Sequence, residues 1–178
     1  PPAGFFFSPP SRPSPILSGL VGSEMCIRDR HFSGRKGFVE TQKSLWASWV
    51  VKSGKRSFYF SGDSGYSKHY KEIGKKYGPL ELVFMDSGQY NTRWRSVHNM
   101  PDEVIKGFID VKGENLIPIH WGMFTLAMHN WFDPPVEIEK RAKEQNISLI
   151  TPIIGQVIDM ENLIVSESWW EKLIDLVK

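Results

Sequence analysis

The sequence contains one cysteine, Cys26, among 178 residues. A single thiol cannot close a disulfide within the chain, and a zinc site built from several cysteines is excluded as well. No apolar run approaches the roughly 20 residues that a membrane-spanning helix needs. We therefore expect no transmembrane segment, and any metal site would have to use histidine and carboxylate ligands.

Residues 1–18 are rich in proline, serine and phenylalanine and show no helical or strand periodicity. Reverse-translated with ordinary codons, residues 20–30 resemble the transposon-end adapter used to prepare DNA sequencing libraries. A signal peptide would need a basic segment and then roughly 7–15 apolar residues, but prolines interrupt the apolar runs here. A natural proline-rich linker is the other alternative. We expect residues 1–30 to be non-native and disordered.

Strong charge of either sign is also absent. The chain has 22 basic and 20 acidic residues. Three of the basic and two of the acidic residues lie in residues 1–30, which leaves 19 basic and 18 acidic residues in 31–178. This near balance gives no sign of a nucleic-acid partner. Residues 31–178 have the length of one ordinary domain or of half a larger one.

The remaining sequence alternates strand-like and helix-like segments. Residues 45–52 and 57–61 are aromatic and β-branched runs joined by a short glycine-containing turn, which predicts a β-hairpin. Helical spacing with stop signals predicts helices, and short apolar runs predict strands. The predicted helices are 67–77, 101–112, 134–146 and 168–178, and the further strands are 80–85, 116–120 and 147–154. This alternation indicates an α/β fold with a mixed sheet and flanking helices.

Three polar residues stand at the ends of predicted strands, where α/β folds place their sites: His31, Asp63 and His120. Each has an ordinary structural interpretation, because a histidine that closes a strand often serves the fold and Asp63 lies in a turn-forming Gly-Asp-Ser-Gly. Gly62 and Gly65 favour a functional interpretation, because glycine lets backbone approach a bound group closely.

The segments RHFSGR, FSGDSGY, VHNMPDEV and IPIHWGMFTL together resemble the C-terminal half of metallo-β-lactamase-fold hydrolases. The branch that contains N-acyl-phosphatidylethanolamine phospholipase D is the most similar. The resemblance implies half of an αββα sandwich over residues 31–178, part of a dinuclear zinc hydrolase; iron or manganese would also suit the ligand types. It further implies a small-molecule or lipid substrate and a cytoplasmic or peripheral membrane location.

The resemblance also implies roles for single residues. His31, Asp63 and His120 correspond to metal ligands, with Asp63 bridging two ions, and His98 corresponds to a catalytic histidine beside the substrate. Asp63 also counts as catalytic, because the bridged ions would activate the attacking water. His69, on a surface-type helix, and His129, in a solvated loop, are not expected to bind metal.

Two departures from the family pattern are visible. The segment MDSGQY replaces an apolar run, so Asp86, Ser87 and Gln89 predict a more polar wall at the site and weaken the case for a lipid. The His-x-His-x-Asp-His motif that supplies the other ligands does not occur in the 178 residues. We therefore expect a truncated chain that binds metal weakly and is inactive alone. A hydrolase of lactones, β-lactams or other acyl groups and a non-catalytic α/β binding module are the alternatives.

Overall fold

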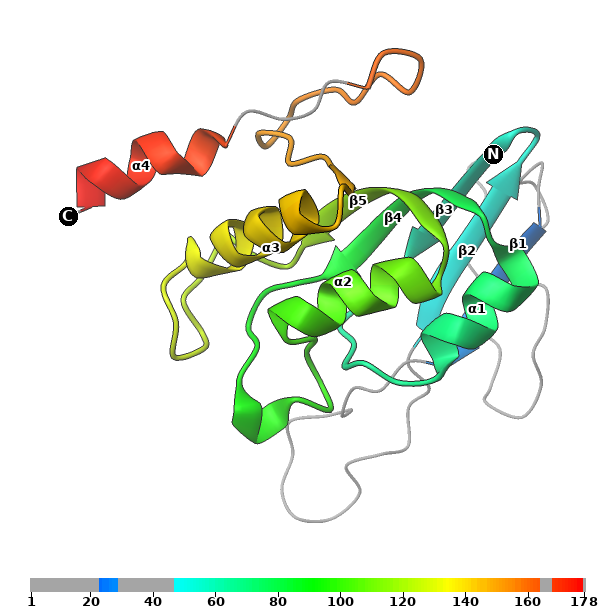
Figure 1. Ribbon diagram of the computed structural model, residues 1–178, viewed down its shortest axis with the longest axis horizontal. Coiled ribbons are helices and arrows are strands. Elements are labelled where there is room, and N and C mark those ends of the chain that lie inside the picture. Colours follow the sequence, from blue (N-terminus) through cyan, green and yellow to red (C-terminus); the bar gives the residue numbers. More distant parts are fainter. Residues whose placement is uncertain (1–22, 29–46, 164–167, 178) are drawn as a thin grey trace, which may run out of the picture.

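The computed structural model describes residues 23–28, 47–163 and 168–177. Six strands form one sheet in the order β1-β2-β3-β4-β5-β6 (Figure 1). The strands are β1 (Ser23–Arg28), β2 (Ala47–Ser53), β3 (Arg56–Phe60), β4 (Leu80–Asp86), β5 (Gly113–Ile119) and β6 (Ser148–Leu149). The helices are α1 (His69–Tyr77), α2 (Pro101–Asp110), α3 (Asp133–Glu144) and α4 (Trp169–Val177), with a 3-10 turn, η1 (Thr92–Trp94).

The sheet is mixed, which confirms the α/β prediction. Strands β2 and β3 form the predicted antiparallel hairpin. From β3 onward each strand is parallel to the next, and α1, α2 and α3 make the crossovers between them. Parallel strands joined in this way bring their carboxyl ends to one edge of the sheet, where polar side chains from separate loops can meet.

Strand β6 is much shorter than the predicted strand at 147–154. Only Ser148 and Leu149 pair with β5, although the Ile150 N–H still donates to the Leu116 carbonyl at 2.8 Å. Pro152 follows two residues later and has no N–H to continue the ladder, so the strand cannot extend through it.

Strand β1 differs from the sequence expectation. It lies within residues 1–30 and pairs antiparallel with β2 over six residues. The unpaired edge of β2 offers a row of N–H and C=O groups to any extended segment, whatever its side chains. Ser23–Arg28 thus form a strand in the structure, whereas residues 1–22 and 29–30 lie outside the described part of the chain. The expectation of a non-native, disordered segment over residues 1–30 stays a prediction.

Helices α1, α2 and α3 cover one face of the sheet, as Figure 1 shows. Alternation along the strands directs one set of side chains to this face, including Val83 and Met85 from β4 and Leu116 from β5. They pack against apolar helix residues such as Tyr70, Val104, Phe108 and Ile138, all of which are buried. The main core thus lies between the sheet and these three helices.

The opposite face carries a smaller apolar cluster. Leu82, Ile117 and Ile150 are buried there, and residues of the segment after β6, such as Ile158 and Met160, pack against them. At the carboxyl end of β3, Phe60 is 45% exposed. An apolar sheet face that is covered only in part is typical of a surface that another layer completes.

None of the helices that the structure describes is both long enough and apolar enough to cross a lipid bilayer.

Candidate metal centre

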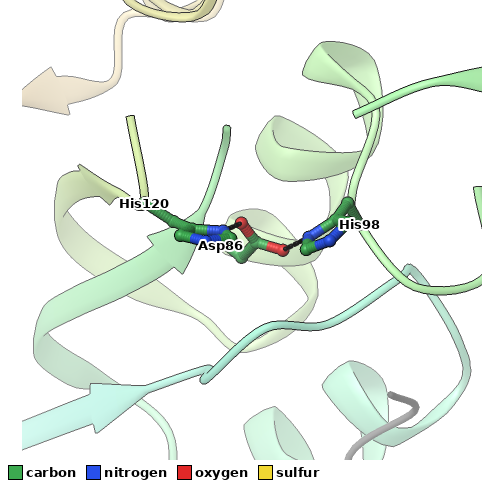
Figure 2. A group of neighbouring side chains, drawn as sticks. All are labelled: Asp86, His98 and His120. Carbon is green, nitrogen blue, oxygen red and sulfur yellow. Dashed lines mark hydrogen bonds and ion pairs between the residues drawn. The ribbon is translucent and has the colours of Figure 1, made fainter. Parts of the chain in front are cut away.

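Asp86, the last residue of β4, lies at the centre of a polar cluster at the carboxyl edge of the sheet (Figure 2). Its Oδ1 atom is 3.0 Å from His120 Nδ1, and its Oδ2 atom is 2.8 Å from His98 Nδ1. Oδ2 also accepts the Ser64 N–H at 3.1 Å. The Asp86 side chain is fully buried, so these donors replace the water that its carboxylate would otherwise bind.

The cluster is assembled by the ends of three parallel strands. Asp63 follows β3, Asp86 ends β4, and His120 follows β5 directly. His98 comes from the loop before α2, and its ring centre is 5.2 Å from that of His120. Asp63 Oδ1 lies 3.6 Å from His120 Nδ1, so two carboxylates and two imidazoles gather at one point.

Glycine makes this convergence possible at two places. A Cβ atom on Gly88 would lie 1.7 Å from the His120 carbonyl oxygen, so only glycine lets the chain after Asp86 pass there. A Cβ atom on Gly65 would lie 2.4 Å from the Ser96 backbone, in the loop that carries His98. Gly65 therefore makes room for the protein's own backbone, not for a bound group as the sequence suggested.

Neighbouring polar groups hold Asp86 in place from behind. Its N–H donates to Ser61 Oγ at 2.8 Å, and its carbonyl accepts from Asn99 Nδ2 at 3.2 Å. The same amide nitrogen of Asn99 donates to the Tyr70 hydroxyl at 2.9 Å, which ties the cluster to α1. Because Ser61, Asn99 and Tyr70 are themselves buried, the Asp86 backbone has little freedom to move.

The two carboxylates raise the pKa of His120. The hydrogen bond to Asp86 is the largest cause, burial opposes it, and the charges of Asp86 and Asp63 add to the rise. A cation is thus favoured beside these carboxylates, and a metal ion would have to compete with a proton for His120.

The donor set suits a metal ion. Asp86, His98 and His120 each offer one nitrogen or oxygen atom, and these atoms all lie within 4.8 Å of one another. Asp63, whose side chain is 45% exposed, adds a carboxylate that faces solvent. Imidazole and carboxylate ligands are those that zinc, iron and manganese accept in proteins. The residues therefore fit the metal that the sequence motifs imply.

Three of the four predicted site residues come together. Asp63, His98 and His120 meet at this edge of the sheet, whereas His31 lies outside the described residues. Asp86 was not predicted as a metal ligand or catalytic residue. It is the last residue of β4, and Asp63 and His120 similarly come at or just after the ends of β3 and β5. The rule that selected those two residues, polar side chains at the carboxyl ends of strands, would have found it too.

The polar wall predicted from MDSGQY does not form. Asp86, Ser87 and Gln89 are all buried and bond to neighbouring protein groups. Ser87 donates its N–H and its hydroxyl to the Ile119 carbonyl, at 3.1 and 3.0 Å. Their polarity is therefore directed into the protein instead of toward a substrate.

Gln89 organises the loop that follows His120. Its amide nitrogen donates to the Phe124 carbonyl at 2.8 Å, and its amide oxygen accepts from the N–H groups of Leu126 and Ala127 at 3.1 and 2.9 Å. This loop exposes four large apolar side chains: Met123, Phe124, Leu126 and Met128. Beside the candidate metal centre the chain thus presents an apolar rim, by which we mean these four residues.

Two other histidines differ from their predicted surroundings. His69, expected on a surface, is buried at the start of α1, and its Nδ1 lies 2.5 Å from Ser67 Oγ. His129, expected to be solvated, is half-buried and stacks on Tyr90 with ring centres 4.3 Å apart. Neither belongs to the cluster around Asp86, and that they do not bind metal stays a prediction.

Tryptophans pack behind the cluster. Trp121, the residue after His120, stacks on Trp169 with ring centres 5.4 Å apart and meets Trp170 edge to face at 5.6 Å. Trp169 and Trp170 begin α4, so the last helix docks beside His120. Farther from the cluster, Trp49 is half-buried in β2, and Trp46 lies outside the described residues.

Comparisons with known proteins agree with this architecture. Residues 21–121 match the model of the beta-lactamase superfamily domain. Rv0906, an uncharacterized protein of Mycobacterium tuberculosis, is 36% identical over 149 residues, which cover 82% of this chain and 40% of the relative. N-acyl-phosphatidylethanolamine-hydrolyzing phospholipase D 1 of Caenorhabditis elegans is 31% identical over 150 residues, 80% of this chain and 42% of the relative. The chain thus spans about two fifths of these curated relatives.

Among solved structures, the metallo-beta-lactamase fold protein YhfI of Bacillus subtilis superposes with a TM-score of 0.55 and 13% sequence identity. The match covers 82% of this chain and 51% of that protein and shows the shared fold. The family match also takes in residues 21–30, whose non-native origin stays a prediction. Since the family model spans more than half of the chain, the protein belongs to the beta-lactamase superfamily and has the metallo-β-lactamase fold that its motifs predicted.

Proposed function

We propose that this chain supplies part of the dinuclear zinc centre of a phospholipase D-like phosphodiesterase. The main support is the meeting of Asp63 and His120 from the ends of β3 and β5, with Asp63 Oδ1 only 3.6 Å from His120 Nδ1. Membership of a metal-dependent hydrolase family supports the same conclusion. Zinc, when bound, would supply Lewis acidity and an activated water for attack on the substrate.

Within this proposal, each residue has a role. Asp63 and His120 would hold metal, and His31 would be the further ligand expected from the sequence. His98 is the residue that orients the scissile group or protonates the leaving group. Its side chain is 11% exposed, and Nδ1 is engaged by Asp86, so Nε2 is the nitrogen through which it would exchange a proton.

A lipid is the substrate class that we favour. The apolar rim lies directly after His120 and exposes Met123, Phe124, Leu126 and Met128, which suits an acyl chain. Asp86, Ser87 and Gln89, whose polarity weakened the case for a lipid, are buried and bond to protein groups. A relative that covers most of the chain is named as a hydrolase of N-acyl-phosphatidylethanolamine. A lactone, β-lactam or other acyl substrate is the alternative within the enzyme class.

We expect the 178-residue chain alone to bind zinc weakly and to hydrolyse little. Under the roles given above, Asp63 and His120 are the metal ligands among the described residues, whereas a catalytic zinc site typically has about three protein ligands. Calorimetric titration of the chain with zinc tests this expectation. Tight, stoichiometric uptake would contradict it.

The activity is tested in the full-length protein that contains this region, with N-acyl-phosphatidylethanolamine as substrate. We expect His120→Ala to lower kcat/KM by several orders of magnitude, because hydrolysis would lose its activated water. Lys140→Ala, on the exposed side of α3, is the control and should change little. Unchanged turnover in His120→Ala would contradict the role given to His120. No turnover by the unmutated protein would favour a non-catalytic binding module, and hydrolysis of a lactone but no phosphodiester would favour the other enzyme class.

A further inference from the structure

Asp86 contacts two histidines through the same ring nitrogen of each. Its carboxylate oxygens lie 2.8 Å from His98 Nδ1 and 3.0 Å from His120 Nδ1 (Figure 2). A carboxylate oxygen can only accept a hydrogen bond, so each Nδ1 must carry the proton. A neutral imidazole protonated at Nδ1 has its lone pair at Nε2.

We propose that Asp86 is a positioning residue that fixes both His98 and His120 in the Nδ1–H tautomer, so that each presents Nε2 to the reaction. The purpose of the two Nε2 atoms rests on the proposed function: His120 would bind metal and His98 would serve the substrate. Histidines that bind metals commonly donate their other ring N–H to a carboxylate in this way.

Burial distinguishes this carboxylate from that of Asp63. The Asp86 side chain is fully buried and already accepts three N–H groups, whereas the Asp63 side chain is 45% exposed. A substrate or an ion arriving from solvent would meet Asp63 first. Asp86 contacts the histidines from the buried side, where it can orient their rings without meeting solvent.

The two carboxylate oxygens of Asp86 have different partners, so the proposal predicts different effects of Asp86→Asn on His98 and on His120. Oδ2 accepts the Ser64 N–H as well as His98 Nδ1, whereas Oδ1 faces His120. In Asp86→Asn the amide nitrogen cannot face Ser64, because both groups are donors. The amide oxygen would therefore take the Oδ2 position, and the amide nitrogen would donate to His120 Nδ1. His120 would then carry its proton on Nε2, while His98 would keep its tautomer.

The experiment reads these protons directly. We would label the histidines of the 178-residue chain with ¹⁵N and record long-range ¹H–¹⁵N spectra without metal, at a pH where the imidazoles are neutral. His98→Gln and His120→Gln assign the signals. In the unmutated chain we expect Nδ1–H on both rings, and in Asp86→Asn a switch to Nε2–H at His120 alone. Nε2–H at His120 in the unmutated chain, or no change in Asp86→Asn, would overturn the proposal.

A second measurement concerns zinc. Loss of such a supporting carboxylate typically weakens metal binding about 10- to 100-fold, and we expect that loss for Asp86→Asn in a calorimetric titration of the full-length protein with zinc. Asp110→Asn is the matched control, because Asp110 accepts a hydrogen bond from Tyr66 and takes no part in the cluster. If Asp86→Asn does not fold, as judged by circular dichroism, Asp86→Ala replaces it; a mixture of His120 tautomers is then expected, and a single Nδ1–H form would contradict the role of Asp86.

The outcomes separate this inference from the proposed function. If zinc shifts the Nδ1 signal of His120 instead of Nε2, then Asp86, His98 and His120 bind the ion themselves, and the positioning role is wrong. If the tautomers are as expected but zinc does not bind even in the full-length protein, the positioning role stands and the metal centre fails.

Discussion

Gly88 and His120 approach so closely that a side-chain carbon on Gly88 would lie 1.7 Å from the His120 carbonyl oxygen. We therefore expect Gly88→Ala to displace His120 and to destabilise the fold by about 1–3 kcal/mol or more, as over-packing does. Urea unfolding measures the stability, and the ring ¹⁵N signals of His120 report the displacement. Gly54→Ala is the control: its φ of 59° costs energy too, but no atom lies within 4 Å, so the His120 signals should not move.

The raised pKa of His120 predicts a pH-dependent stability. The folded-state pKa lies above the unfolded value of about 6.5, because Asp86 accepts its hydrogen bond and both Asp86 and Asp63 favour the imidazolium. The contribution of protonated His120 is therefore complete below the unfolded pKa and is lost as the pH rises through the folded pKa.

The measurement is the free energy of unfolding in urea as a function of pH, for the unmutated chain and for His120→Gln. We expect the advantage of the unmutated chain to shrink as the pH increases above about 6.5. Zinc should behave in the opposite way, since it competes with the proton and binds more tightly at higher pH. An advantage that grew with pH in the absence of metal would contradict the assigned cause.

Gln89 should be one of the more sensitive polar residues. Its amide bonds to the Phe124 carbonyl and to the N–H groups of Leu126 and Ala127. Gln89→Ala leaves the buried N–H of Ala127 unpaired, which costs about 1–3 kcal/mol. Amide hydrogen exchange should become faster at Ala127 and Leu126. Gln145→Ala, at an exposed position after α3, should leave both the exchange and the stability nearly unchanged. Equal effects of the two substitutions would show that the amide does not hold the loop.

The face of the sheet opposite α1–α3 predicts self-association of the chain. Phe60 is 45% exposed beside half-buried Phe58 and Phe84, and exposed apolar sheet faces promote association. We expect the 178-residue chain to elute as oligomers or aggregates in size exclusion, and Phe60→Lys to shift it toward the monomer. Ile109→Lys changes a similarly exposed residue, 52%, on the outer side of α2 and should have a smaller effect. A monomeric unmutated chain would refute this expectation.

Most of the fold could be predicted from sequence, because its signals are local. The hairpin follows from two β-branched and aromatic runs, and α2 follows from Pro101 at its first position and helical spacing behind it. Strand β1 could not be predicted in this way, since it depends on the unpaired edge of β2. The length of β6 likewise depended on where pairing with β5 stops.

The site was predicted in part. Asp63 and His120 stand out because they follow strands whose carboxyl ends meet, and the spacing of VHNMP added His98. Asp86 was interpreted as part of a polar wall, because a sequence does not show whether a carboxylate faces solvent or the interior. The same ambiguity affected His69. Lys68 and Lys71 lie close to it in the sequence and suggested a solvent-exposed helix face, but the His69 side chain is buried. Burial of a single polar side chain depends on which segment packs over it, and that is a tertiary property.

The ring centres of Trp121, Trp169 and Trp170 lie within 6 Å of one another, and Trp121 directly follows His120 in the sequence. Rings at such separations couple their electronic transitions, so the protein carries an optical reporter beside the candidate metal centre. Occupancy or protonation of His120 should alter the near-ultraviolet dichroism of these indoles, and ligand binding could be followed without any attached dye.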